Sequence, residues 1–223
     1  MKYLADENWW MSIFDDVYLQ TDARSVCDDH LTREEVNFLE KGLKVSKHWQ
    51  ILDLCGGQGR HALELSRRGF LNITVFDYSG YLLLNGKQKA AGEDLAVTFI
   101  RGDARYIGLQ DGGFDFIMLM GSSFGYFIRE GENRKILTES FRLLMPQGFI
   151  LLDLPDKNHV INNFKPRAYH RVNNQLEVNR ERKLEEDVIY CREKVVDASG
   201  QCIRDKLYCT RLYSQQHIQD ILQ

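Results

Sequence analysis

Apolar positions follow two different periods over the first two thirds of the chain. Short apolar runs, typical of buried strands, are separated by stretches with the 3.6-residue period of helices. Strands are predicted near 50–54, 72–76, 97–101, 114–119 and 148–153. Helices are predicted at 60–68, 79–91 and 132–145, with a short one near 104–108; Pro146 is expected to close the last long helix and Gly148 to lie in the next turn. Repeated strand–helix–strand units predict an α/β fold with a doubly wound, mostly parallel sheet.

The stretch before this sheet carries aromatic residues at helical spacing. Residues 7–20 are predicted to form one amphipathic helix in which Trp10, Phe14 and Tyr18 share a face. Trp9 lies on the adjacent side and would anchor the helix on the core. Since the aromatic side chains can cover a pocket and exclude water, this helix is predicted to be a lid, with Tyr18 reaching the ligand.

The segments on either side of the sheet core have other patterns. A second helix is predicted to begin at "LTREEVNFLEKGL", because Thr32 and Glu35 have the spacing of a capping box and Gly42 suits a helix end. Residues 167–213 alternate with period 2, and "DASGQ" predicts a hairpin turn, so an antiparallel appendage is expected there. Ser214 is a candidate N-cap for a last helix. One face of the appendage is expected to be apolar, through Val188, Tyr190, Val195 and Leu207.

Composition narrows the function classes. The 223 residues carry a net charge of −3, which disfavours a nucleic-acid surface. Mixed charges over 180–187 are interpreted as a solvated, salt-bridged strand face. No apolar stretch approaches the roughly 20 residues that span a bilayer. The five cysteines form no CxxC pair, so neither disulfides nor a metal site are expected, and the predicted location is cytoplasmic.

Each of the first three predicted parallel strands ends in an aspartate. They are Asp53 in "ILDL", Asp77 in "TVFDYS" and Asp103 in "FIRGDAR". Because ligands of open α/β sheets bind beyond the carboxyl ends of the strands, these carboxylates are expected along one rim of the sheet.

A dinucleotide is one candidate ligand for this rim. Gly57, Gly59 and Ala62 fit G-x-G-x-x-A, and Asp77 follows Gly57 by 20 residues, as in a dinucleotide-binding fingerprint. However, Asp53 would place a carboxylate close to a doubly charged pyrophosphate. A ligand with positive charge and hydrogen-bond donors suits the rim better, and S-adenosylmethionine is such a ligand.

The ordered motifs carry a family resemblance. The segments "ILDLCGGQGRHALELSRRGF", "VFDYS", "FIRGDAR", "FDFIMLMGSSFGYF" and "LLMPQGFILLDL" resemble those of class I, Rossmann-like S-adenosylmethionine-dependent methyltransferases of the small-molecule branch. The resemblance is strong over residues 50–155. At one position, Cys55, the chain departs from the family's first loop glycine. We expect the strand order 3-2-1-4-5, with the reaction product S-adenosylhomocysteine.

The resemblance assigns cofactor-binding roles by position. Asp53 would orient the loop and the cofactor's amino group, and Asp77 would bind the ribose hydroxyls. Asp103 would accept from the adenine amine. The full set of cofactor-binding residues implied is Asp53, Cys55, Gly57, Gly59, Asp77, Tyr78, Asp103, Ala104 and Met120. For Arg60, contact with the cofactor carboxylate and simple exposure at a helix start are both open.

The acceptor is not specified by the sequence. Methyl transfer is an in-line displacement in which positioning dominates, and a base matters only for some acceptors. Side chains considered for the acceptor side are Trp10, Tyr18, Ser122, Ser123, Tyr126, Asp153 and His159, of which Tyr126, Asp153 and Tyr18 are proposed as catalytic. The predicted acceptor is a small-molecule N, O or C atom. Alternatives are an RNA methyltransferase, a methyltransferase-like binding or assembly module without activity, and an NAD-dependent oxidoreductase.

The domain organisation is expected to be a single methyltransferase domain over 1–223. Its parts would be a helical lid (1–45), a cofactor-binding core (46–155), an antiparallel appendage (156–213) and the start of a C-terminal helix (214–223). The family usually completes its sheet with two further strands, so the last helix is expected to be truncated. A homodimer through 167–213 is also expected, since an apolar sheet face must be buried.

Overall fold

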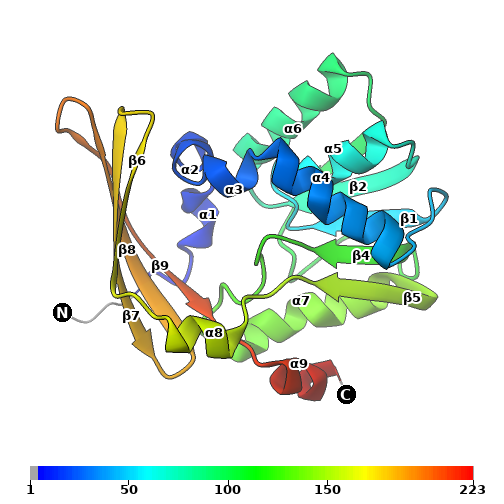
Figure 1. Ribbon diagram of the computed structural model, residues 1–223. Coiled ribbons are helices and arrows are strands. Elements are labelled where there is room, and N and C mark those ends of the chain that lie inside the picture. The colour runs from blue at the N-terminus through cyan, green and yellow to red at the C-terminus, as the bar shows by residue number, and fades with distance from the viewer. Residues whose placement is uncertain (1–4, 223) are drawn as a thin grey trace. The chain divides into compact units, whose positions relative to one another are not determined.

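The computed structural model describes residues 5–222, without the side chains of residues 23 and 24, and these residues form two compact units (Figure 1). The first unit comprises 23–124 and 134–154. The second comprises 5–22, 125–133 and 155–222. Within 5–222, no helix is long and apolar enough to cross a membrane.

The first unit is built on a five-stranded sheet in the order β3-β2-β1-β4-β5. All four strand pairs are parallel, so the predicted doubly wound topology and its 3-2-1-4-5 order are confirmed. The strands are β1 (Gln50–Leu54), β2 (Asn72–Asp77), β3 (Val97–Arg101), β4 (Phe114–Leu119) and β5 (Leu144–Leu152).

Helices alternate with these strands and complete the core. They are α3 (Ala23–Val26), α4 (Asp29–Asn37), η1 (Phe38–Gly42), α5 (Arg60–Arg67), α6 (Gly80–Gly92) and α7 (Glu130–Leu143). Helix α4 lies against α5, and α6 packs on β3 (Figure 1). Leu39, Ile51, Leu65 and Phe116 are buried together in the resulting core. This burial fixes the strand ends on which the candidate site is built.

Two predictions around β4 and β5 are wrong. Residues 104–108 form turns, not a short helix. Helix α7 ends at Leu143, and Pro146 and Gly148 lie inside β5, not at a helix end and in a turn. The register between β4 and β5 shifts after the pair of Phe114 and Leu144 and resumes at Phe116 and Phe149. Pro146 therefore sits where the ladder is interrupted, the place in a strand that tolerates a missing N–H.

The predicted capping box of the second helix is also wrong. Helix α4 begins at Asp29, and Asp28 caps it by accepting from the backbone N–H groups of His30 (2.8 Å) and Leu31 (3.0 Å). The Thr32 hydroxyl donates back to the Asp28 carbonyl. Aspartate is as strong an N-cap as threonine, and it stands one turn earlier in the chain. Glu35 is thereby available for a contact with another helix.

The second unit contains a four-stranded antiparallel sheet in the order β6-β7-β8-β9, which confirms the predicted appendage. Its strands are β6 (Arg167–Val172), β7 (Leu176–Glu185), β8 (Val188–Asp197) and β9 (Cys202–Arg211). Two helices flank it, α8 (Lys157–Asn162) and α9 (Gln215–Leu222). Ser214 caps α9 by accepting from the His217 N–H at 3.1 Å, as predicted.

The expectation of one apolar face is wrong in detail. Tyr190 and Val195 are five residues apart on β8, and the register of β8 with β7 is uninterrupted between them. Alternate residues of a strand point to opposite faces, so Val188 and Tyr190 lie on the face opposite Val195. The face that carries Val195 also carries charged residues, and the most buried of these are paired.

The predicted helix over 7–20 is interrupted. The structure has α1 (Trp10–Ile13) and α2 (Asp16–Thr21), with a break at Phe14 and Asp15. Asp15 caps α2 by accepting from the Tyr18 N–H at 3.1 Å. Trp10, Phe14 and Tyr18 therefore do not share one helix face: the Trp10 ring contacts Phe127, while the Phe14 and Tyr18 rings meet edge to face.

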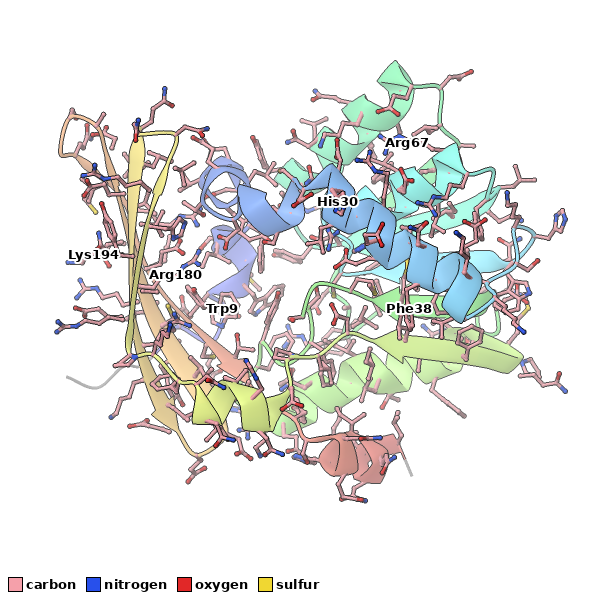
Figure 2. The ribbon with its side chains drawn as sticks, in the orientation of Figure 1. Trp9, His30, Phe38, Arg67, Arg180 and Lys194 are labelled. Carbon is pink, nitrogen blue, oxygen red and sulfur yellow. The ribbon has the colours of Figure 1, made fainter. Side chains whose placement is uncertain are left out.

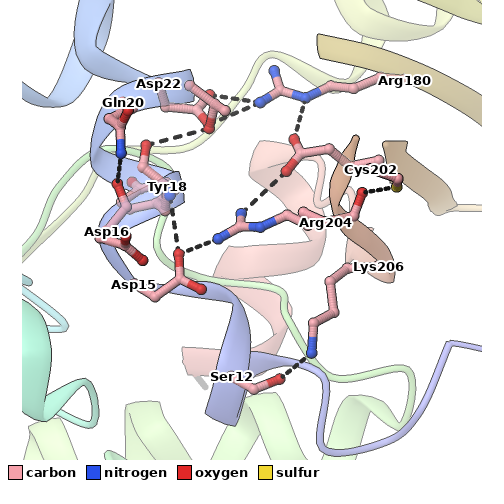
Figure 3. Close-up of polar contacts among 12 residues, drawn as sticks. Ser12, Asp15, Asp16, Tyr18, Gln20, Asp22, Arg180, Cys202, Arg204 and Lys206 are labelled. Atoms are coloured by element: carbon pink, nitrogen blue, oxygen red, sulfur yellow. Dashed lines mark hydrogen bonds and ion pairs between the residues drawn. The ribbon is translucent and has the colours of Figure 1, made fainter. Parts of the chain in front are cut away.

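Five residues that we call the charged network join α2 to the antiparallel sheet (Figure 3). Arg180 donates to both oxygens of Asp22 (2.9 and 2.8 Å) and to Glu193 (2.7 Å). Arg204 donates to Glu193 at 3.1 Å and is paired with Asp15. Glu193 and Arg204 are each 3% exposed in their side chains. The face is salt-bridged as predicted, but this part of it is not solvated.

The opposite face of the same sheet is different. Figure 2 shows Arg180 and Lys194 on opposite sides of the sheet, in keeping with the pairing of Arg180 with Glu193 and of Asn179 with Lys194. Lys194 is exposed. The buried pairs of Glu193 with Arg180 and Arg204 thus lie on the face of the sheet opposite Lys194.

Candidate functional site

The parallel register brings the strand-end aspartates to one edge of the first unit. Asp53 on β1 pairs with Val75 on one side and with Met118 on the other. Asp77 ends β2, and Asp103 follows β3 by two residues. Because β3, β2 and β1 are adjacent, their carboxyl ends meet at the same rim, as predicted from the sequence.

A tight loop over residues 55–59 connects β1 to α5. Cys55, Gly57 and Gly59 have φ values of 57°, 58° and 70°, so three of its five residues are left-handed. A Cβ on Gly59 would lie 2.9 Å from Val75 Cγ2, which leaves no room for a side chain. The Cys55 N–H donates to the Phe76 carbonyl at 2.7 Å. Cys55 accepts the left-handed conformation at a cost of about 1–2 kcal/mol, while glycine at 59 is required by space.

Asp77 ties this loop to the second strand. Its Oδ2 accepts from the Gly57 N–H (2.8 Å) and its Oδ1 from the Ser79 N–H (2.7 Å). Burial raises its pKa to about 6, an effect that these backbone hydrogen bonds oppose and the Asp53 charge reinforces. A carboxylate can accept about four hydrogen bonds. Asp77 therefore retains capacity to accept from the hydroxyls of a ligand.

Asp53 is fully buried beneath the loop. A Cβ on Gly56 would come within 2.5 Å of its carboxyl carbon, so glycine allows the loop to pass directly over the carboxylate. Burial raises its pKa, while the charges of His61 and Arg60 and the Ala62 N–H oppose the rise. Within the described chain neither carboxylate oxygen has a hydrogen bond of normal geometry. A buried acceptor in this state is suited to a donor group supplied by a ligand.

Asp103 lies in a different environment from the other two aspartates. Its two oxygens accept from the Arg105 backbone N–H (2.9 Å), from Arg105 Nε (3.1 Å to each oxygen) and from Arg105 Nη2 (2.7 Å). Burial would raise its pKa, but these hydrogen bonds and the Arg105 charge lower it. Ala104, the other predicted adenine contact, lies between the two paired residues.

Tyr78 is backed by an arginine at the same rim. The Arg101 guanidinium carbon lies 5.5 Å from the centre of the Tyr78 ring, and Arg101 Nε donates to the Tyr78 carbonyl at 3.0 Å. These contacts hold the residue that follows Asp77.

The ends of β4 and β5 close the rim. The Ser123 hydroxyl contacts both the Met120 carbonyl (2.7 Å) and the Cys55 carbonyl (3.4 Å), so it links this end to the loop. Asp153 Oδ2 accepts from the Gly121 N–H at 2.8 Å. All nine predicted cofactor-binding residues, and Asp153 as well, thus lie in the first unit on or beside one set of strand ends.

Sequence reasoning missed Glu35. Its carboxylate accepts from Arg60 and lies 2.9 Å from His61 Nε2, so it holds both residues of the first turn of α5. Burial opposes its ionisation, but these two partners outweigh burial and lower its pKa to about 2. Arg60 is thereby directed toward α4 and does not stand exposed. The spacing of Thr32 and Glu35 had suggested a capping box, so Glu35 was assigned to the helix end. The sequence offered one other signal, an acidic residue on a helix that precedes the glycine loop.

Tyr18 and Tyr126, the other two predicted catalytic residues, lie in the second unit. The Phe14 ring contacts both, with centroids 5.0 Å from Tyr18 and 5.6 Å from Tyr126. Trp9 Nε1 donates to the Tyr126 carbonyl at 3.2 Å. The structure therefore gathers these tyrosines around one phenylalanine, and their roles toward a ligand stay predictions.

Residues 51–148 match the family model described as a methyltransferase domain. A glycine/sarcosine N-methyltransferase of Parasynechococcus marenigrum is 28% identical over 120 residues, which are 53% of this chain and 42% of that protein. The ubiquinone/menaquinone biosynthesis C-methyltransferase UbiE of Bartonella tribocorum is 34% identical over 109 residues, 47% of this chain and 40% of that protein. The chain spans about half the length of the curated relatives it matches.

Solved structures extend the likeness over the rest of the chain. An S-adenosylmethionine-dependent methyltransferase of Clostridium acetobutylicum has a TM-score of 0.75 at 17% identity, over 92% of this chain and 83% of that one. CalS10, an amino pentose methyltransferase of Micromonospora echinaspora, has a TM-score of 0.69 at 16% identity, over 92% and 86%. At these identities the likeness shows the fold.

Proposed function

We propose that this chain, a class I S-adenosylmethionine-dependent methyltransferase by the family of its residues 51–148 and by its fold, transfers a methyl group from S-adenosylmethionine to a small-molecule acceptor. The observation that carries the proposal is the rim itself. Asp53, which is buried, and Asp77, which is partly buried, lie beside a glycine loop. Among the described residues neither carboxylate forms a direct ion pair, and Asp77 accepts from backbone N–H groups.

The residues of the rim fit this cofactor better than a dinucleotide. Within the described residues neither buried oxygen of Asp53 has a hydrogen bond of normal geometry, which suits a ligand donor, and the cofactor carries an ammonium group. The remaining lone pairs of Asp77 suit ribose hydroxyls. A pyrophosphate at the same loop would meet buried carboxylates and be repelled. The cofactor supplies an activated methyl group on a sulfonium; the protein binds it, orients it and excludes water.

The acceptor side rests on fewer contacts. We propose Asp153, Tyr126 and Tyr18 as the residues that serve the acceptor. Asp153 uses one oxygen to hold the Gly121 N–H, and its other oxygen can take a proton from an amine or hydroxyl acceptor. The names of the relatives support acceptors as different as an amino acid and a quinone precursor, so the proposal extends to a small-molecule N, O or C atom.

The organisation predicted from the sequence belongs to the same proposal. Three predictions are retained. They are one methyltransferase domain with its four parts, a homodimer through 167–213, and a cytoplasmic location. Size-exclusion chromatography with light scattering checks the dimer.

Binding of the product S-adenosylhomocysteine tests the proposed function most directly. Titration calorimetry on the purified chain is expected to show S-adenosylhomocysteine binding and negligible NAD binding. Tight NAD binding without an S-adenosylhomocysteine signal would overturn the methyltransferase proposal. Binding without methyl transfer to any metabolite pool or RNA would favour the binding-module alternative, and transfer to RNA alone would replace the small-molecule acceptor.

The role of Asp153 is tested by Asp153→Asn. We expect the variant to keep the affinity for S-adenosylhomocysteine within about twofold, because the amide oxygen can still accept from Gly121, and to lower turnover by about 10²–10⁴-fold if a proton is transferred. Unchanged turnover would remove Asp153 from the acceptor side.

A further inference from the structure

Arg182 on β7 is a half-buried arginine whose side chain has no partner among the described residues. Its Nε is shielded from water and has no hydrogen bond. No described side chain forms an ion pair with its guanidinium, and only its backbone N–H is engaged, by the Pro166 carbonyl at 2.7 Å. Buried polar groups are nearly always hydrogen-bonded, so an exception of this kind needs an explanation.

The immediate neighbours of Arg182 do not neutralise its charge. Arg182 pairs with Cys191 on β8, and burial raises the pKa of that thiol, which therefore stays neutral at neutral pH. On its other side Pro166 carries no charge. Arg180 lies two residues earlier on the same face of β7 and is itself a cation. An anion that approaches Arg182 would therefore meet an uncompensated positive charge.

The charged network lies on the same face but does not extend to Arg182. Each of its three carboxylates accepts from Arg180 or Arg204, as Figure 3 shows, and none of them forms an ion pair with Arg182. Arg180 and Arg182 are thus a paired and an unpaired arginine on one strand and one face. The unpaired one is free to bind a ligand.

Arg182 lies near an aromatic side chain that leads to the residues proposed for the acceptor. Cys191 pairs with Arg182 on one side and with Tyr208 on the other, so all three share a face. Neighbouring strands are about 4.8 Å apart, which places the Cα atoms of Arg182 and Tyr208 about 10 Å apart. The Tyr208 ring contacts Trp9 at 5.6 Å, and Trp9 contacts Tyr126 at 5.1 Å. All of these residues belong to the second unit.

We propose that Arg182 binds an anionic group of the methyl acceptor, which makes the acceptor a small molecule that carries a carboxylate or a phosphate. A guanidinium binds the oxygens of either group with two parallel hydrogen bonds, and partial burial strengthens the attraction. This inference rests on the proposed function, because it requires the acceptor to lie beside the aromatic residues that include Tyr126.

Anion binding to the wild type, Arg182→Met and Lys183→Met tests the site without turnover. Methionine keeps an unbranched stem and removes the charge. Lys183 is the neighbouring residue on the opposite face, where it is exposed and paired with Glu185, so its variant is the matched control. Thermal unfolding of each protein is followed in sodium acetate, sodium phosphate and sodium chloride at equal ionic strength.

We expect acetate or phosphate to raise the Tm of the wild type and of Lys183→Met by at least about 2 °C over chloride, and to raise the Tm of Arg182→Met by less than half as much. The ion with the larger effect distinguishes a carboxylate from a phosphate. An equal rise in all three proteins, or no rise in the wild type, would overturn the inference. If Arg182→Met does not fold, Arg182→Gln, which also removes the charge, replaces it.

Methyl transfer tests whether the bound anion belongs to the acceptor. A metabolite pool is separated on an anion exchanger, and the retained and unretained fractions are each supplied with S-adenosylmethionine. We expect S-adenosylhomocysteine to form from the retained fraction alone. Arg182→Met should raise the half-saturating amount of that fraction at least about tenfold and leave the affinity for S-adenosylhomocysteine unchanged. Turnover of the unretained fraction alone would overturn the inference and leave the proposed function standing. A wild type that binds no S-adenosylhomocysteine would refute the proposed function itself.

Discussion

Two groups of buried carboxylates in this molecule are compensated in opposite ways. In the charged network of the second unit, Glu193 lies between Arg180 and Arg204, and Asp15 and Asp22 complete the pairs. At the rim of the first unit, Asp77 accepts from backbone N–H groups, and Asp53 has two unpaired oxygens within the described chain. Glu193 and Asp53 are both removed from water, yet only Glu193 has arginines as hydrogen-bond partners.

The difference separates a structural role from a binding role. A buried carboxylate that is fully paired with arginines serves the fold, and it has little hydrogen-bonding capacity left for a ligand. A buried carboxylate held by backbone dipoles, with its pKa raised, keeps part of its hydrogen-bonding capacity for a group that arrives later. Asp103 stands between the two cases, since it lies at the rim but is paired with Arg105. Substitutions in each group test this separation.

Glu193→Ala, which removes the central carboxylate of the charged network, should cause the largest loss of stability. Removal of this carboxylate leaves Arg180 and Arg204 buried without their shared partner, and such a loss typically costs about 3–5 kcal/mol of unfolding free energy. Urea unfolding measures it. The control is Lys194→Ala on the exposed face of the same strand, which should cost at most about 1 kcal/mol. A Glu193→Ala loss no larger than the control would mean that the network contributes nothing to stability.

Asp77→Asn should affect binding while sparing the fold. Two charge-assisted hydrogen bonds to ribose hydroxyls are each worth roughly 1.5–3 kcal/mol, so affinity for S-adenosylhomocysteine should fall at least about tenfold. Thermal unfolding is measured alongside, because the variant relieves the cost of ionising this group but leaves the N–H of either Gly57 or Ser79 without its acceptor. Asp115→Asn is the control: Asp115 lies near the start of β4, where it accepts from the Gln50 N–H at 2.8 Å. Equal dissociation constants in the two variants would place the ribose elsewhere.

The raised pKa of Asp77 gives a pH dependence with a definite sign. Its pKa is about 6 in the folded protein, against an ordinary value of 3.8 for an aspartate in water. Below pH 6 the carboxyl is protonated, and its charge-assisted hydrogen bonds to both ribose hydroxyls require the ionised form, so affinity should fall by up to about tenfold per pH unit. Calorimetry between pH 5 and pH 8, in buffers of different ionisation enthalpy, measures both the affinity and the released proton. The dependence should vanish in Asp77→Asn.

The same shift affects stability in the opposite direction. A carboxyl with a raised folded-state pKa favours the folded state fully below pH 3.8 and loses that contribution as the pH rises through 6. A shift from 3.8 to about 6 corresponds to about 3 kcal/mol. As the pH rises from 4 to 7, the unfolding free energy of the wild type should therefore decrease relative to that of Asp77→Asn. A flat difference would show that Asp77 ionises as it would in water.

The first unit was more predictable from sequence than the second for a physical reason. Strand periodicity and glycine turns are local, and parallel pairing then carries Asp53, Asp77 and Asp103 to one rim without further information. Long-range partners are not local. Asp15 interrupts the predicted helix over 7–20 where it pairs with Arg204, which is 189 residues away. Glu35 likewise serves Arg60 and His61 instead of the cap that its spacing predicted.

Tyr18→Phe tests the smallest effect, on a side chain outside both carboxylate groups. The ring contacts Phe14 edge to face, and the variant retains that contact while it removes the hydroxyl. Unfolding free energy should therefore stay within about 0.5 kcal/mol of the wild type. If the hydroxyl serves the acceptor, as we propose, turnover should fall while affinity for S-adenosylhomocysteine stays constant. Phe14→Leu is the control for packing, since it removes the ring contact and should reduce stability. If stability, affinity and turnover of Tyr18→Phe all remain at wild-type values, Tyr18 is a packing residue, and the lid predicted from the N-terminal aromatic residues loses its main contact.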